Sequence, residues 1–170
     1  MPDGLGNKGV DQRFAVAVHA MCVLSYHSPE LSNASFVGDS ISVNPLIAKR
    51  IIGSMVKAGL AEAVLGARGG YRLARSADQV SLWDIYHAVQ GNGPFRSRYG
   101  MPESNCDEGR AIDRVVFDLY EDLDQEIERR LSQITLAQIL LAAERVERIP
   151  LDAIQVGAFS MTLPPVCPRS

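Results

Sequence analysis

Residues 64–73 read VLGARGGYRL, in which three glycines surround Arg68, and such a loop can hold a phosphate, form a tight turn or touch nucleic acid. A nucleotide-binding P-loop needs a Gly-Lys-Ser or Gly-Lys-Thr run that continues into a helix. Here the alternating Tyr71, Arg72 and Leu73 indicate a strand instead. The loop therefore predicts a β-hairpin whose glycine-rich tip carries an arginine.

Other residues that could do chemistry are scattered along the chain. The cysteines Cys22, Cys106 and Cys167 are odd in number and far apart, which fits neither a disulfide framework nor a closed zinc site. The three histidines fall on separate expected elements, and no pair of carboxylates and no nucleophile beside a base stands out. We therefore expect neither an enzyme nor a metal site.

Composition narrows the class of protein. The chain has 170 residues, 46% of them apolar, which suits one globular domain with an added element. Residues 1–100 carry ten Lys and Arg against seven Asp and Glu, whereas residues 101–170 carry seven against thirteen. A basic half joined to an acidic half permits nucleic-acid binding by the first. The apolar run 14–24 has no cleavage site after it and is too short for a membrane span, so we expect a cytoplasmic protein.

Helix signals are clear in the basic half. Apolar spacing predicts a core helix over residues 12–26, and Asn33 can cap a short second helix. A third helix has Asn44 as its N-cap, Pro45 at its first position and Gly59 as its stop. Its apolar side chains predict the buried face: Ile47, Ile51, Ile52, Met55 and Val56.

The third helix also has a basic outer face, formed by Lys49, Arg50 and Lys57. After the hairpin, Ser81 and Asp84 form a capping-box pattern that starts a fourth helix. Three helices, a hairpin and a helix are the order of a winged helix-turn-helix, a fold class that is mainly α with a small β-hairpin. In that layout the third helix enters the major groove of DNA and the hairpin tip reaches the backbone or the minor groove.

The acidic half is predicted to be helical. A Gly- and Pro-rich loop over 92–106 precedes an amphipathic helix from Asp107 to Leu131, and Thr135 with Gln138 forms a second capping box that starts a shorter helix. The apolar stripe of the long helix either pairs with a second copy of the chain or packs within one copy. It consists of Ile112, Val115, Val116, Leu119, Leu123, Ile127 and Leu131.

These signals divide the chain into five parts. Residues 1–10 form a flexible N-terminus, and residues 11–91 form the winged helix-turn-helix domain. The loop 92–106 then leads to dimerisation helices over 107–147. A C-terminal tail over 148–170 has the composition of disorder.

One segment also resembles a known family. The run ISVNPLIAKRIIGSMVKAGLAEAVLGARGGYRLARSADQVSLWDIYHAVQG (residues 41–91) resembles the Rrf-two family, the IscR/NsrR-type winged-helix transcription regulators of bacteria. The shared features are a helix ending in K-x-G-L, a G-x-x-G-G-Y wing, and a helix ending near V-x-G. The resemblance continues through NCDEGRAIDRVVFDLYEDLDQEIERRLSQITLAQIL (residues 105–140), which is similar to the long dimerisation helix of the family.

The resemblance implies a DNA-binding transcriptional regulator, with a repressor as the expected kind. It also implies a homodimer whose long helices cross and whose two recognition helices meet a palindromic operator in double-stranded DNA. By position it assigns these DNA-binding residues: Ser42, Val43, Asn44, Pro45, Lys49, Arg50, Arg68, Gly69, Gly70 and Arg72. Lys49 and Arg50 can neutralise phosphates, and Arg68 on a thin tip can enter a narrow minor groove. Arg72 is either a contact behind the tip or a solvated strand residue.

The cysteines depart from the family pattern. Several members hold an iron-sulfur cluster with three closely spaced cysteines before the long helix, but residues 91–110 contain only Cys106. We therefore expect no cofactor. Cys106 is either a redox sensor or a structural cysteine, because a helix N-terminus favours the thiolate while Asp107 and Glu108 oppose it. The alternatives to the leading function are a helical protein-interaction module and an iron-sulfur or metal-sensing regulator.

Overall fold

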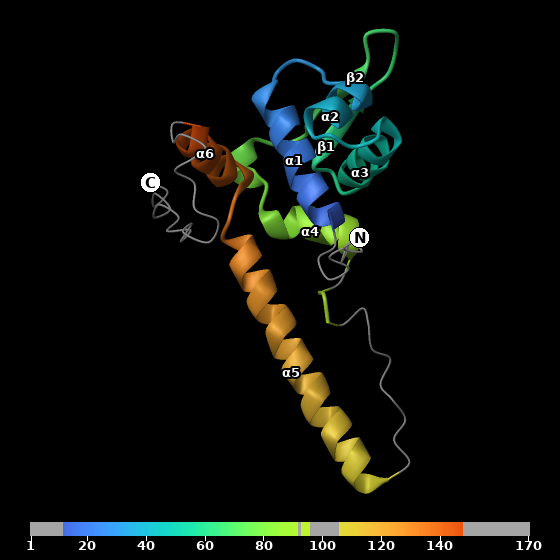
Figure 1. Cartoon of the computed structure of the whole chain (residues 1–170), viewed down its shortest axis with the longest axis vertical. Helices are drawn as coiled ribbons and strands as arrows, with labels where there is room; N and C mark the ends of the chain where they lie inside the picture. The colour runs from blue at the N-terminus through green and yellow to red at the C-terminus, as the bar shows by residue number, and fades with distance from the viewer. Residues whose placement is uncertain (1–11, 92, 96–105, 148–170) are drawn as a thin grey trace, which may run out of the picture.

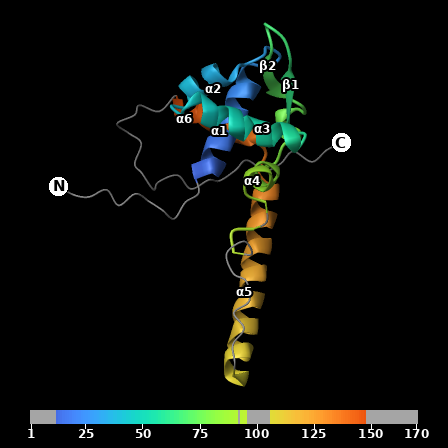
Figure 2. The ribbon, with the colours of Figure 1, turned by 90° about the vertical axis from the view of Figure 1, so that its right-hand side faces the viewer.

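A computed structural model describes residues 12–91, 93–95 and 106–147. A compact head carries one long helix that projects away from it, and the hairpin lies at the opposite end of the molecule (Figures 1 and 2). The predicted mainly helical class with a small hairpin is confirmed. The predicted flexible N-terminus, the C-terminal tail and residues 96–105 of the predicted loop lie outside the described residues. Within the described part, every helix is too short or too polar to cross a bilayer.

Helix α1 (Gln12–Tyr26) has the range that the apolar spacing predicts, and α2 (Ala34–Ser40) and α3 (Pro45–Lys57) begin where the capping residues predict. The Asn33 side chain accepts a hydrogen bond from the Phe36 N–H at 2.8 Å, and the Asn44 side chain accepts one from the Leu46 N–H at 2.8 Å. Gly59 follows α3 with a φ of 69°, the left-handed conformation that ends a helix. The signals that set these ends are local, and for that reason the sequence predicts them.

The turn between α2 and α3 is built by close backbone contact. The Val43 N–H donates to the Gly38 carbonyl at 2.9 Å, and Ser42 takes a left-handed φ of 56°. A methyl group on Gly38 would lie 2.9 Å from the Val43 carbonyl oxygen and 3.2 Å from the Cα of Pro45. The angle between α2 and α3 therefore depends on the missing side chain at position 38.

The hairpin consists of β1 (Ala61–Val64) and β2 (Gly70–Leu73), paired antiparallel. Backbone hydrogen bonds between Ser32 and Tyr71, at 3.0 and 2.9 Å, attach the outer side of β2 to the segment before α2. A methyl group on Gly69 would lie 2.3 Å from the Val64 carbonyl oxygen, so the turn requires glycine there. The hairpin is therefore anchored along β2, while residues 65–68 of its tip are exposed.

The core of the head lies between α1, α3 and α4 (Leu82–Gln90), with the base of the hairpin and the start of α6 closing it. The prediction for α3 was wrong at one position. Ala48 is buried and Ile47 is 46% exposed, because the stripe that faces the core consists of residues 48, 51, 52 and 55. Val56 is half-buried.

The chain continues from the head into α5 (Asp107–Ser132) and α6 (Leu136–Glu147). The end of α5 is joined to the head at the point where α4 and α6 begin side by side. A short 3-10 helix, η1 (Ala77–Gln79), leads into this joint. The Leu82 N–H donates to the Ile134 carbonyl at 2.8 Å, and the Leu136 N–H donates to the Val80 carbonyl at 2.9 Å. These two bonds fix the foot of α5 to the head.

Both predicted capping boxes flank that joint. The Ser81 Oγ accepts from the Asp84 N–H at 3.1 Å, while Asp84 accepts from the Ser81 N–H at 3.0 Å. Likewise Thr135 Oγ1 accepts from the Gln138 N–H at 3.3 Å, and Gln138 accepts from the Thr135 N–H at 3.0 Å. The N-termini of α4 and α6 are thus capped at the point where the backbones before the two helices meet.

A second contact, which the sequence did not predict, connects the head to α5. The Phe95 N–H donates to Asp124 Oδ1 at 3.1 Å, and the Phe95 ring stacks on Tyr120 with centroids 5.3 Å apart. Asp124 is buried, and a methyl group on Gly93 would lie 2.3 Å from its carboxyl carbon. The segment after α4 therefore lies closely against α5.

The turn between α2 and α3 gives a stability test. We expect Gly38→Ala to lower the free energy of unfolding by about 1–3 kcal/mol, because backbone atoms on the far side of the turn must shift. Gly53→Ala is the matched control: Gly53 lies in α3 with no atom near its would-be methyl, so alanine should raise the free energy by about 0.5–1 kcal/mol. Urea unfolding at one protein concentration measures both, and equal effects would contradict the packing described here.

Candidate nucleic-acid interface

The start of α3 carries the first group of predicted DNA-binding residues. Ser42, Asn44 and Pro45 are exposed. Val43 is only half-exposed, and its side chain packs against the core. It therefore stabilises the turn and offers little surface to DNA. The exposed residues lie in the turn between α2 and α3 and at the first position of α3, and α2 supports that turn through its backbone.

The amide of Asn44 has one function already. Its Oδ1 accepts the Leu46 N–H at 2.8 Å and thereby caps α3. The side-chain NH₂ remains to donate. A bidentate contact to adenine needs both the oxygen and the NH₂, whereas a single acceptor such as guanine O6 or a phosphate oxygen needs only the NH₂. While the Asn44 oxygen caps α3, its side chain can only donate hydrogen bonds to DNA.

Lys49 and Arg50 supply the positive charge of this helix. Both are exposed and follow the cap by one turn, and neither has an ion pair within the described residues. Lys57 is exposed at the other end of the helix. Cations that pair with none of the described residues are available to phosphates.

Two apolar side chains on the same helix were missed by the sequence interpretation. Leu46 is 74% exposed, and Ile47, which was predicted to be buried, is exposed beside it. A large apolar side chain at the start of a recognition helix cannot bind a phosphate, but it can contact the methyl group of thymine. Ile47 and Ala48 each lie three or four residues before Ile51, so helical spacing alone did not separate them.

The hairpin presents Arg68 on its exposed tip, between β1 and β2. Leu65, on the same tip, is 94% exposed and was not predicted as a site residue. Gly69 serves the turn through its close approach to Val64, as described above. Gly70, the first residue of β2, lies against the segment before α2 instead, because a methyl group there would lie 3.0 Å from the Ser32 carbonyl oxygen.

Arg72 is less available than Arg68. It faces Glu62 across the strand pair, with its Nε 3.0 Å and its terminal nitrogen 2.9 Å from Glu62 Oε2. Both side chains are about half-exposed, so the pair is worth little to stability, but it offsets the charge of the arginine. Of the two wing arginines, Arg68 is therefore the stronger candidate for a DNA contact.

These residues share one end of the molecule. The hairpin tip and α3 both lie in the head, remote from the free end of α5 (Figures 1 and 2). A family model described as "Rrf2: Iron-dependent Transcriptional regulator" matches residues 10–142. The chain belongs to the Rrf2 family. It is a DNA-binding regulator of transcription and not an enzyme.

Individual relatives of the Rrf2 family agree with this assignment. YwnA of Bacillus subtilis is 24% identical over 131 residues, covering 77% of this chain and 96% of YwnA. The protein slr0846 of Synechocystis is 34% identical over 95 residues, covering 56% of this chain and 60% of slr0846. Both are named HTH-type transcriptional regulators.

Solved structures share the fold. IscR of T. potens is 25% identical with a TM-score of 0.62, covering 83% of this chain and 92% of that chain. CymR of B. subtilis, titled the global cysteine regulator, is 18% identical with a TM-score of 0.59, covering 78% of this chain and 96% of that chain. The winged-helix fold with its long helix is thus common to these regulators.

The description of the family names iron, and a cluster held by cysteines needs several thiolates close together. Among the described residues, Cys22 lies within α1 and Cys106 precedes α5, and no group of three or more His, Cys, Asp or Glu could hold a metal ion. Burial raises the pKa of the Cys22 thiol to about 11, which disfavours the thiolate. This part of the chain does not fit a cluster. Because Cys167 lies outside it, the lack of a cofactor stays a prediction.

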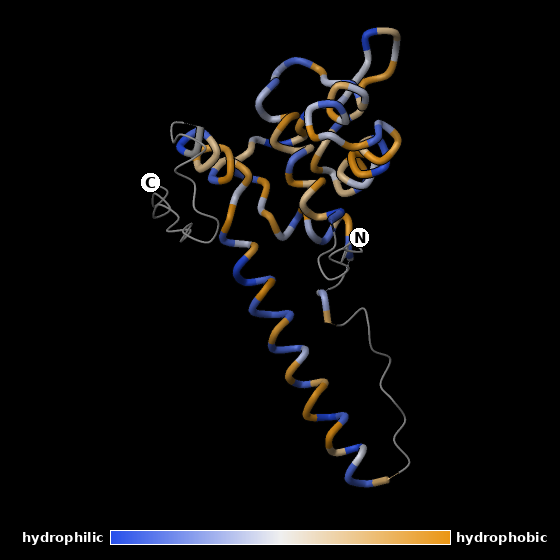
Figure 3. The backbone as a smooth tube through the Cα atoms, viewed as in Figure 1, coloured by the Kyte–Doolittle hydropathy of each residue, from blue (hydrophilic) through white to orange (hydrophobic). Residues whose placement is uncertain are grey.

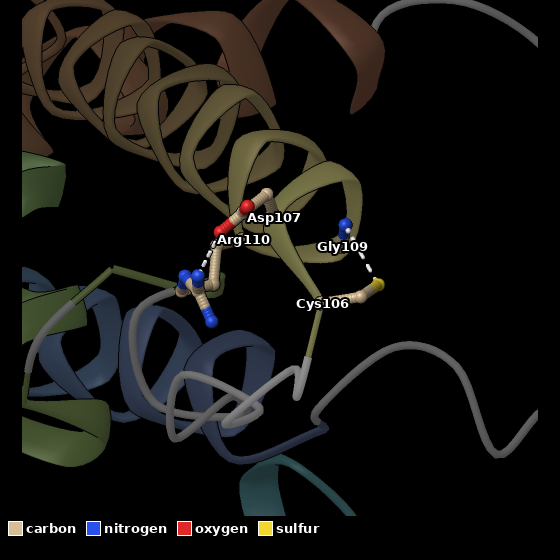
Figure 4. Close-up of polar contacts among 4 residues, drawn as sticks. All are labelled: Cys106, Asp107, Gly109 and Arg110. Atoms are coloured by element: carbon tan, nitrogen blue, oxygen red, sulfur yellow. Dashed lines mark hydrogen bonds and ion pairs between the residues drawn. The ribbon is translucent and has the colours of Figure 1, made fainter.

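Cys106 is exposed and caps α5. Its Sγ accepts a hydrogen bond from the Gly109 N–H at 3.3 Å, and Asp107 and Arg110 form an ion pair beside it (Figure 4). Solvent access is one requirement of a redox sensor, and it is met. The redox role itself stays a prediction.

The exposed Leu46 gives a test of base reading. An operator obtained by selection from random duplexes should contain a thymine in each half-site whose replacement by deoxyuridine weakens binding about fourfold, the effect of losing about 0.8 kcal/mol of methyl burial. In Leu46→Ala the same replacement should have no effect, because the apolar partner is gone. Fluorescence anisotropy of labelled duplexes measures both. Equal losses in the wild type and in Leu46→Ala would contradict the contact.

Proposed function

We propose that this Rrf2-family protein is a homodimeric repressor that binds a palindromic operator through α3 and the hairpin tip. The observation that carries the proposal is an apolar stripe along α5 that its own chain leaves exposed. Figure 3 shows apolar segments recurring along the whole projecting helix. A long helix with such a surface is unfavourable in water unless another surface covers it.

The stripe has the spacing of a helix-pairing surface. Val115 is 68% and Leu119 is 53% exposed, and Ile112, Val116 and Leu123 are exposed with them. Their separations of three and four residues place them on one face, while charged side chains occupy the rest of the helix. Toward the joint, Ile127 is half-buried, and Leu131 packs against the core of its own chain. The outer five residues therefore favour a second copy as the partner.

The two-fold symmetry of such a dimer supports a palindromic operator. Because the foot of α5 is fixed to the head, pairing of two α5 helices about a two-fold axis would set one distance between two heads. Two identical heads related in this way fit two inverted half-sites, as in other helix-turn-helix dimers. Occupation of such a site within a promoter would exclude polymerase, and the proposal of a repressor rests on this simple mode of action.

The acidic balance of the whole chain does not oppose DNA binding. The sequence pI is about 5.6, yet the exposed cations Lys49, Arg50 and Arg68 belong to the head and stand apart from the acidic α5. Screening limits the reach of charges to about 10 Å at 0.1 M salt, so the local patch matters more than the total. A signal acting through oxidation of Cys106 remains a prediction beside this proposal.

The dimer is tested by a charge placed in the stripe. Leu119→Glu should convert the protein from two copies to one in sedimentation equilibrium, because pairing would bury an unpaired carboxylate. Gln125→Glu adds the same charge at an exposed position outside the stripe and should leave the two-copy state unchanged. Circular dichroism checks that both variants keep their helices. A dimer that persists in Leu119→Glu would contradict the proposed interface.

The DNA contacts are tested by removing single cations. Lys49→Ala and Arg68→Ala should each weaken operator binding about tenfold, which is about 1.4 kcal/mol. For each lost phosphate contact, the slope of log affinity against log salt should decrease by about 0.9. Arg145→Ala removes an exposed cation from α6 and should change neither value.

Full operator affinity in both variants would remove these residues from the interface. A wild-type protein that retains no sequence-specific DNA in titrations at moderate salt would favour the protein-interaction module instead.

A further inference from the structure

A small pocket lies where the end of α3, the end of β2 and α4 meet. It has a volume of about 210 Å³. The lining residues are Ala58, Leu60, Arg75, Trp83, Asp84 and His87. At about 30 Å³ per water, this volume corresponds to roughly seven waters, which is the size of a small metabolite and below the size of drug-like ligands.

The polar side chains of the pocket carry opposite charges. Arg75 is exposed, has no ion pair within the described residues, and extends over Gly59, where a would-be methyl lies 3.9 Å from a guanidinium nitrogen. Asp84 uses one carboxylate oxygen, Oδ2, to accept from the Ser81 backbone N–H at 3.0 Å and the Ser81 hydroxyl at 2.8 Å. Its other oxygen accepts no hydrogen bond from the part of the chain that the structure describes. One cation and one carboxylate oxygen are thus available to a ligand.

The remaining wall is apolar and aromatic. Trp83 stacks on Tyr86 with ring centroids 5.4 Å apart and an angle of 12°, which fixes the orientation of the indole. His87 lies beside it, with centroids 6.2 Å apart. Leu60 is buried and forms part of the lining. A ligand that fits must therefore have an apolar part next to its charged groups.

We propose that this pocket binds a zwitterion of amino-acid size with an apolar side chain. Its carboxylate would pair with Arg75, its ammonium group with the free oxygen of Asp84, and its side chain would lie against Trp83 and Leu60. A carboxylate or an amine alone satisfies only one of the two charges. Binding at this site does not depend on the proposed dimer or operator.

The chain contains a single tryptophan, Trp83, so its fluorescence reports on this pocket directly. The probes are L-phenylalanine, 3-phenylpropionate and phenethylamine, which share a phenyl ring and differ in charge. L-phenylalanine should give a saturable change in fluorescence at millimolar concentration or below. The other two should bind about tenfold more weakly, because each leaves one charged group without a partner.

Variants assign the effect to the pocket. Arg75→Gln should weaken L-phenylalanine binding about tenfold and bring it close to phenethylamine. Arg145→Gln removes an exposed cation on α6 and should bind like the wild type. Asp84→Asn keeps an acceptor for the cap of α4 and should also weaken binding. The proposal is overturned if no probe gives a saturable signal, if the three probes bind equally, or if Arg75→Gln binds L-phenylalanine as the wild type does.

Discussion

The joint between the head and α5 is the constraint on which the rest of the structure depends. Two backbone hydrogen bonds connect the strand-like residues before α4 with those before α6, and a capping box closes each helix at that point. The Phe95 and Asp124 contact adds a second attachment farther along α5. Two attachments on one helix hold its direction as well as its position. Any partner paired along α5 is thereby placed relative to the candidate nucleic-acid interface on α3 and the hairpin tip.

The sequence predicted the elements because their signals are local. Asn44, Pro45 and Gly59 act on backbone groups within a few residues, and so do the capping boxes at Ser81 and Thr135. Such residues report the start or end of a helix whatever surrounds it. The hairpin was equally predictable, since its turn needs glycine at position 69 and the glycine-rich stretch separates two short runs that pair as β1 and β2.

What the sequence could not predict depends on distant neighbours. Ile47 and Ala48 are adjacent, and only the position of α1 and α4 decides which of them is buried. Gly70 looked like a tip residue, but it meets the backbone of Ser32 from another part of the chain. Glu62 lies ten residues before Arg72, and the register of the strands brings them together. The candidate interface therefore consists of the predicted elements. It differs from the prediction in that Glu62 offsets the charge of Arg72, and in that Leu46 is an additional exposed residue.

In the proposed dimer, two rigidly held heads bind one symmetric site. The direct test is selection of binding sites from random duplex DNA, followed by sequencing and by measurement of the mass of the complex. We expect two inverted half-sites with centres about 10–10.5 base pairs apart, or a multiple of that spacing, with two chains on each duplex. A single half-site, a direct repeat, or one chain per duplex would contradict it.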